Sequence, residues 1–83
     1  MTYRYRDTVR DELLRHGVIP SDVTPPELIH QFVNDLYVFE IRALKRRLKD
    51  GTVAMSDYVT QVEKLRNRYP VLSLPVRFWI EAD

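Results

Sequence analysis

The sequence predicts an all-α fold: a three-helix bundle built on a long central helix, with an apolar C-terminal tail packed on it. Three observations support this class. Apolar residues recur at helical spacing in three segments, His16-Gly17 and Asp50-Gly51 have the composition of helix ends, and two glycines in 83 residues leave little material for β-hairpin turns. A chain of this length forms one small domain that buries only about 60% of its unfolded surface.

The first helix is predicted over residues 3–16. Its apolar residues follow helical spacing and are Tyr5, Val9, Leu13 and Leu14. Gly17 can adopt the left-handed conformation that commonly follows the last turn of a helix. We therefore expect a short amphipathic helix that ends before Gly17.

The central helix is predicted over residues 25–49, with Thr24 as its cap and Glu27 completing a capping box. Its apolar residues form two seams. The first seam consists of Tyr37, Ile41, Leu44 and Leu48, and the second seam consists of Leu28, Phe32, Leu36 and Phe39. Because a helix with two seams must contact two neighbours, we expect the third helix on the first seam. The first helix, through Val9 and Leu13, is expected to cover part of the second.

The third helix is predicted over residues 56–69, antiparallel to the central one, with Ser56 as its cap. The tail, residues 70–83, alternates apolar residues as a strand would, but Pro75 interrupts it and the chain offers no other strand for pairing. We expect an extended or partly helical tail docked on the bundle, because a disordered segment rarely concentrates so many apolar residues.

Glu40 is unusual because it lies among apolar neighbours between the two seams. Folding the hairpin about residue 53 places Arg66 opposite Glu40. A partly buried carboxylate needs a partner to offset its loss of hydration, so we expect a structural ion pair between these two residues. The alternative, a catalytic carboxylate, lacks support because the histidine of this helix, His30, lies ten residues away.

The sequence contains no pattern that predicts catalysis. His16 and His30 share no metal-ligand spacing, cysteine is absent, and two isolated glycines cannot form a phosphate-binding loop. We expect no enzymatic activity, no metal and no cofactor. The N-terminus lacks the apolar segment of a signal peptide, no run is long enough to span a membrane, and the absence of cysteine fits a reducing compartment. A cytoplasmic protein without membrane contact is expected.

Basic residues concentrate in the second half of the chain, although the net charge is only +1. One cluster contains Arg42, Lys45, Arg46, Arg47 and Lys49, and another contains Lys64, Arg66 and Arg68. Positive charge near the end of the central helix complements the helix dipole. The same residues can contact phosphates, so nucleic-acid binding is the alternative function. An antiparallel hairpin places the two clusters toward opposite ends, which argues against that function.

Residues 41–65 resemble the SHOCT type of short helical domain. The resemblance is carried by Ile41, Leu44, Leu48, Gly51, Val53, Asp57, Tyr58, Val62 and Leu65. The resemblance implies a module that associates with other proteins and has no catalytic activity. The chain departs from this family in having long segments on both sides of the matching part, and no functional residue is carried over.

We expect the protein to act as a small accessory module through protein–protein interaction or self-association, most simply as a dimer. The chain has more apolar side chains than so small a core readily absorbs. The candidate interface residues are Val38, which points away from both seams, and Leu74, Val76, Phe78 and Trp79 of the tail. Trp79 is the expected hot spot, because burial of an indole removes much apolar area from water.

Overall fold

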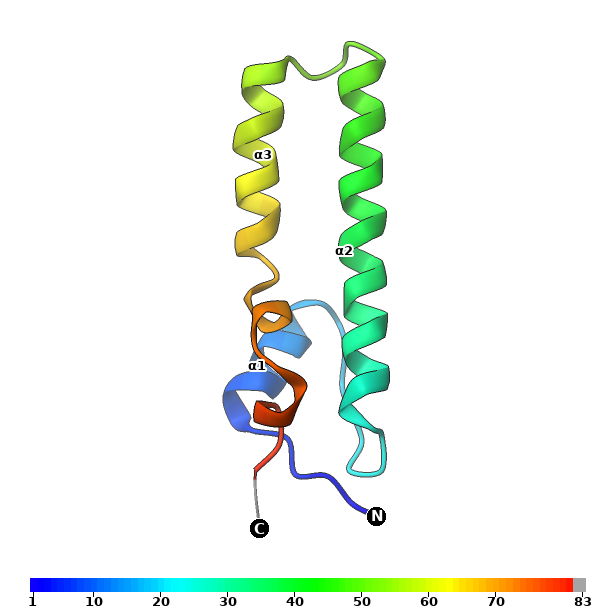
Figure 1. The fold of residues 1–83 in the computed structure, drawn as a ribbon, viewed down its shortest axis with the longest axis vertical. Helices are drawn as coiled ribbons and strands as arrows, with labels where there is room; N and C mark the ends of the chain where they lie inside the picture. The colour runs from blue at the N-terminus through cyan, green and yellow to red at the C-terminus, as the bar shows by residue number, and fades with distance from the viewer. Residues whose placement is uncertain (82–83) are drawn as a thin grey trace.

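The computed structural model confirms the all-α class and describes residues 1–81. Within this range it has three α-helices, α1 (Asp7–Arg15), α2 (Pro26–Lys49) and α3 (Met55–Asn67), followed by two short 3-10 helices, η1 (Pro70–Ser73) and η2 (Val76–Phe78). α2 and α3 form an antiparallel hairpin, while α1 and the tail gather beside the N-terminal half of α2 (Figure 1). The molecule is therefore elongated, measuring 51 × 18 × 16 Å.

The turn of the hairpin depends on Gly51, whose φ of 76° lies in the left-handed region that other residues rarely adopt. The Thr52 amide donates to the carbonyl of Arg47 (2.9 Å), which closes the end of α2. Val53 follows the turn and is buried. The glycine identified in the sequence as a helix stop is thus the residue about which the chain reverses.

The main core lies where α1, α2, the end of α3 and the tail meet. Its buried members are Tyr5, Val9, Leu13, Val18, Val33, Leu65, Tyr69, Val71 and Trp79. Trp79 has no exposed surface, and its indole Nε1–H donates to the carbonyl of Leu74 (3.0 Å). An aromatic side chain buries about 150–250 Å², so Trp79 is a large part of this small core. The predicted docking of the tail is confirmed, and the tail docks on its own chain.

The first helix begins later than predicted, at Asp7, because the residues before it are extended. Tyr5 forms an isolated antiparallel bridge with Ile80, and the amide of Arg6 donates to the carbonyl of Trp79 (2.9 Å). The amide of Glu81 donates to the carbonyl of Arg4 (2.8 Å). The expectation that the tail has nothing to pair with is therefore wrong, since its partner is the segment that precedes α1.

The predicted side-chain caps are also wrong. α2 begins at Pro26, and the Thr24 hydroxyl is hydrogen-bonded to that of Ser21 (2.7 Å) instead of capping the helix. α3 begins at Met55, so Ser56 lies inside its first turn. Neither helix has a side-chain cap, and the first turn of each instead carries one acidic residue, which interacts favourably with the helix dipole.

Candidate interaction surface

The second seam of α2 is largely exposed. Leu28, Phe32 and Phe39 have 58%, 53% and 67% of their surface open to solvent. Leu36, the remaining member, is half-buried and packs against the core. Spacings of four and three residues place all four side chains on one side of the helix. α2 therefore presents a continuous apolar row to solvent.

α1 covers less of this row than expected, since only Leu36 packs against the core to which α1 contributes. α1 is only nine residues long and packs chiefly against η1. Its apolar residues Val9 and Leu13 are buried in the core around Trp79. Figure 1 shows α3, α1 and the tail following one side of α2, so the helix lacks the second neighbour that its sequence pattern requires.

The structure removes the expected hot spot, Trp79, from the predicted interface but leaves part of the tail at the surface. Trp79 cannot contact a partner docked on this fold, because it has no exposed surface. Val38 and Val76 are half-buried, whereas Leu74 and Phe78 remain 36% and 43% exposed. The surplus of apolar surface is real, but it is concentrated on the second seam, and Leu74 and Phe78 contribute a smaller part.

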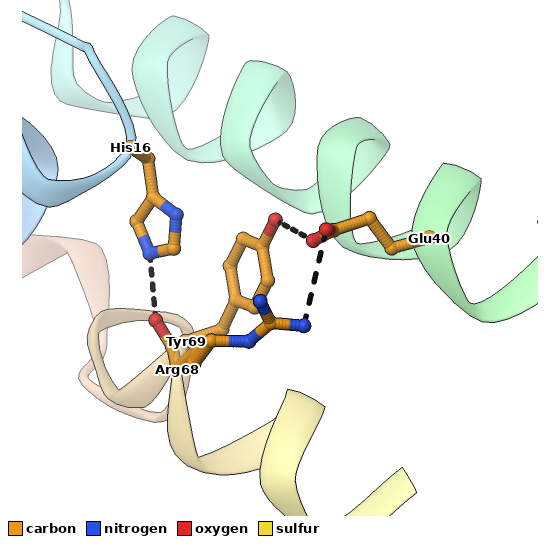
Figure 2. A network of polar contacts seen from close by, with 4 residues as sticks. All are labelled: His16, Glu40, Arg68 and Tyr69. Atoms are coloured by element: carbon orange, nitrogen blue, oxygen red, sulfur yellow. Dashed lines mark hydrogen bonds and ion pairs between the residues drawn. The ribbon is translucent and has the colours of Figure 1, made fainter. Parts of the chain in front are cut away.

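A cluster of four polar residues, which we call the polar junction, connects α1, α2 and the end of α3 (Figure 2). It consists of His16, Glu40, Arg68 and Tyr69. The Tyr69 hydroxyl donates to one carboxylate oxygen of Glu40, and the Arg68 guanidinium lies 4.0 Å from the other. The His16 Nε2–H donates to the carbonyl of Arg68 (2.6 Å), and its ring stacks on that of Tyr69 with 4.1 Å between centroids. The junction fixes where the three segments meet.

The ion pair predicted for Glu40 has a different partner, Arg68 instead of Arg66. Glu40 borders an open hollow with Leu65 and Arg68, so this flank of α3 faces it. Arg66 lies two residues earlier and hence about 200° around the helix. Arg68 is largely exposed and Glu40 is partly exposed, and such a pair contributes only about 0–1 kcal/mol. The hydrogen bond from Tyr69 is the more important contact.

Tyr69 remains protonated at neutral pH. Burial is the main cause that raises its pKa, to about 12, and the hydrogen bond and negative charge of Glu40 raise it further against the opposing effect of Arg68. A phenol of this kind is a hydrogen-bond donor and not a base or nucleophile. The polar junction is therefore suited to holding segments together.

Both histidines have structural contacts. His16 belongs to the polar junction, and the ring of His30 lies 5.4 Å from that of Trp79. An open hollow of about 410 Å³ beside the junction is lined by Arg15 and Asn67 together with junction residues. Residues 1–81 contain no group of three or more His, Cys, Asp or Glu side chains placed to hold a metal ion. The role of His16 was missed because no sequence signal connects it to a tyrosine 53 positions later.

The five residues of the first basic cluster are all exposed and lie in the C-terminal part of α2. None of them forms an ion pair within the part of the chain that the structure describes. Lys45, Arg46 and Arg47 are consecutive and therefore point to different sides of the helix. Arg42, Lys45, Arg46 and Lys49 nevertheless follow spacings of three and four residues, so these four share one face of α2 and only Arg47 lies away from it.

No protein-family model, curated protein or solved structure matches this sequence. The resemblance of residues 41–65 to the SHOCT type stays a prediction. Across residues 1–81, no helix combines the length and the apolar character needed to cross a membrane. Function is therefore inferred from the surfaces of the molecule.

Proposed function

We propose that this protein is a small non-enzymatic accessory module that acts by protein–protein association through the second seam of α2. The exposure of Leu28, Phe32 and Phe39 on one face carries the proposal. Full burial of such a side chain contributes about 1.5–3 kcal/mol, and each of these is already partly covered, so a partner gains about 1 kcal/mol from each. Apolar rows of this kind on a helix are used to dock other helices.

The polar junction supports the same proposal. It holds the end of α3 against α2 through Glu40, on the side away from the second seam, which stays open. A preformed surface loses little conformational entropy on association. The half-exposed Phe78 and Leu74 of the tail are a secondary apolar area at the same end of the molecule.

The proposal predicts a contact at Phe39 in the cells that produce the protein. A photo-reactive phenylalanine analogue placed at Phe39 should form a discrete covalent adduct on illumination, because a partner covers this side chain. The matched control is the same analogue at Thr60, which is exposed on α3 and outside the seam. The adduct is detected as a shift in mass on a denaturing gel. Absence of an adduct from Phe39, or equal adducts from both positions, would contradict the proposal.

Nucleic-acid binding is the second candidate function. The observation that favours it is the exposure of five basic residues without carboxylate partners in residues 1–81, namely Arg42, Lys45, Arg46, Arg47 and Lys49. Free basic side chains attract phosphates without further specificity. Four of them share one face of α2, but the net charge of the chain is only +1, so no overall field draws the molecule to nucleic acid. Weak and sequence-independent binding is therefore the expected extent of this activity.

This expectation is checked by titrating a short duplex at several salt concentrations. We expect binding at low salt that disappears near physiological salt, with a smaller salt dependence for Arg46→Ala/Arg47→Ala, since each lost phosphate contact lowers the slope by about 0.9. Arg4→Ala, an exposed arginine at the other end of the molecule, is the control. Tight binding at physiological salt that depends on Arg46 and Arg47 would favour nucleic acid over a protein partner.

A further inference from the structure

We propose that the partner of the second seam is a second copy of this chain, with the two α2 helices packed antiparallel. This inference rests on the proposed function and specifies its occupant. Three features support it: the spacing of the seam, the charges that flank it and the surface that the single chain leaves exposed.

One row of side chains along α2, exposed at Phe32, Phe39 and Arg46 and half-buried at its other members, has the spacing of a coiled-coil seam. Alternating steps of three and four residues connect Ile29, Phe32, Leu36, Phe39, Ala43 and Arg46. This row shares Phe32, Leu36 and Phe39 with the second seam, has Ile29 in place of Leu28, and continues to Ala43 and Arg46. The pattern is typical of a helix that packs side chains into the spaces of a facing helix.

One antiparallel register places apolar side chains of the two copies opposite one another and sets a large ring against a small residue. In it, Phe39 of each copy faces Leu36 of the other, and Phe32 of each copy faces Ala43 of the other. Ala43 lines an open hollow of about 320 Å³ between α2 and α3, whose other walls include Gln61. Phe32 of the second copy fits this hollow because alanine leaves room for a ring there.

The charges beside the seam favour the antiparallel arrangement. Asp35 and Arg42 flank the seam on the same side, both are exposed, and neither is ion-paired within residues 1–81. In the register above, Asp35 of each copy lies opposite Arg42 of the other, and two-fold symmetry repeats the pair. In a parallel pair, Asp35 would face Glu40 and Arg42 would face Arg47, which are like charges.

The area left exposed by the single chain fits a dimer of ordinary size. The chain exposes 6209 Å², whereas a folded monomer of its mass exposes about 5,200 Å². The difference of about 1,000 Å² resembles the roughly 800 Å² that each partner contributes to a standard interface. The radius of gyration of the chain, 15.3 Å, also exceeds the roughly 12 Å of a compact 83-residue domain.

Disulfide trapping tests this arrangement cleanly, because the chain contains no cysteine. Under mild oxidation, the purified Phe32→Cys/Ala43→Cys variant should form a covalent dimer. Each single variant should form no covalent dimer, since identical positions would lie eleven residues apart along the paired helices. That is about 16 Å, beyond the 4.4–6.8 Å between Cα atoms that a disulfide usually spans. Dimers from the single variants would instead indicate parallel helices and contradict the register.

Charge reversal provides a second test that leaves the seam intact. Asp35→Arg and Arg42→Asp should each raise the dimer Kd about tenfold, because each places like charges opposite one another. An equimolar mixture of the two variants, or the double variant, should restore the wild-type Kd. No trapping by the double cysteine variant and no effect of charge reversal would overturn the dimer. The proposed function would then survive if the adduct at Phe39 contained a different protein, and would fail with the dimer if no adduct formed.

Discussion

Replacing Trp79 with alanine is expected to lower the free energy of unfolding by about 3–5 kcal/mol. The indole is fully buried among α1, α2 and η1, and its Nε1–H satisfies the carbonyl of Leu74. Alanine leaves a cavity and an unpaired acceptor. A domain of this size is stabilised by only about 4–12 kcal/mol, so this substitution removes a large share. Urea unfolding followed by far-ultraviolet circular dichroism measures the loss.

Phe78→Ala is the matched control for this prediction. Phe78 is the neighbouring aromatic residue, but it is 43% exposed and contacts the guanidinium of Arg77. Its removal should cost about 1 kcal/mol or less. Trp79 would not be a central core residue if Trp79→Ala unfolded at the urea concentration of the wild type. The same conclusion would follow if the variant changed the size of the protein in solution and not its stability.

The second large effect is a loss of stability at alkaline pH that depends on Tyr69. The ordinary tyrosine pKa of 10.0 is raised to about 12 in the folded protein, first by burial and then by Glu40. The folded state therefore favours the neutral phenol. The preference stabilises the folded state by about 1–3 kcal/mol. This stabilisation is fully present below about pH 10 and is lost as the pH rises through about 12.

Tyr69→Phe isolates this effect, since the other titrating groups remain. At neutral pH the variant should be less stable by about 1–2 kcal/mol, because it loses a hydrogen bond to a carboxylate. Between about pH 9 and about pH 12 the difference from the wild type should shrink to zero or reverse. Urea unfolding at each pH measures it. Parallel stability curves for the two proteins across this range would show that Tyr69 is not the titrating group.

The hairpin could be predicted because its signals are local. Gly51 marks the reversal, and the first seam lies on the face of α2 that meets α3. The segment around Tyr5 could not be predicted in this way. Tyr5 is four residues from Val9 and so fits a helix, but it pairs with Ile80, and spacing within a segment carries no information about so distant a partner.

The sequence indicated that apolar side chains would remain exposed, but not where they lie. The chain has more apolar residues than one small core can bury. The sequence does not show which of them are buried. The core took Trp79 and left Phe32 and Phe39 exposed. Similarly, the position of Glu40 indicated a cationic partner. Which flank of α3 faces α2 depends on how the hairpin closes, and in the structure Arg68 lies next to Glu40 instead of Arg66.

Molar mass from light scattering over a range of protein concentrations tests most directly whether the second seam is an association surface. The wild type should rise with concentration from 9.9 kDa toward twice that mass. Phe39→Glu should remain at the mass of one chain with unchanged helix content, because Phe39 is 67% exposed and contributes little to the fold. A wild type that stays at the single-chain mass at every concentration, or a variant that associates as readily as the wild type, would contradict self-association through α2.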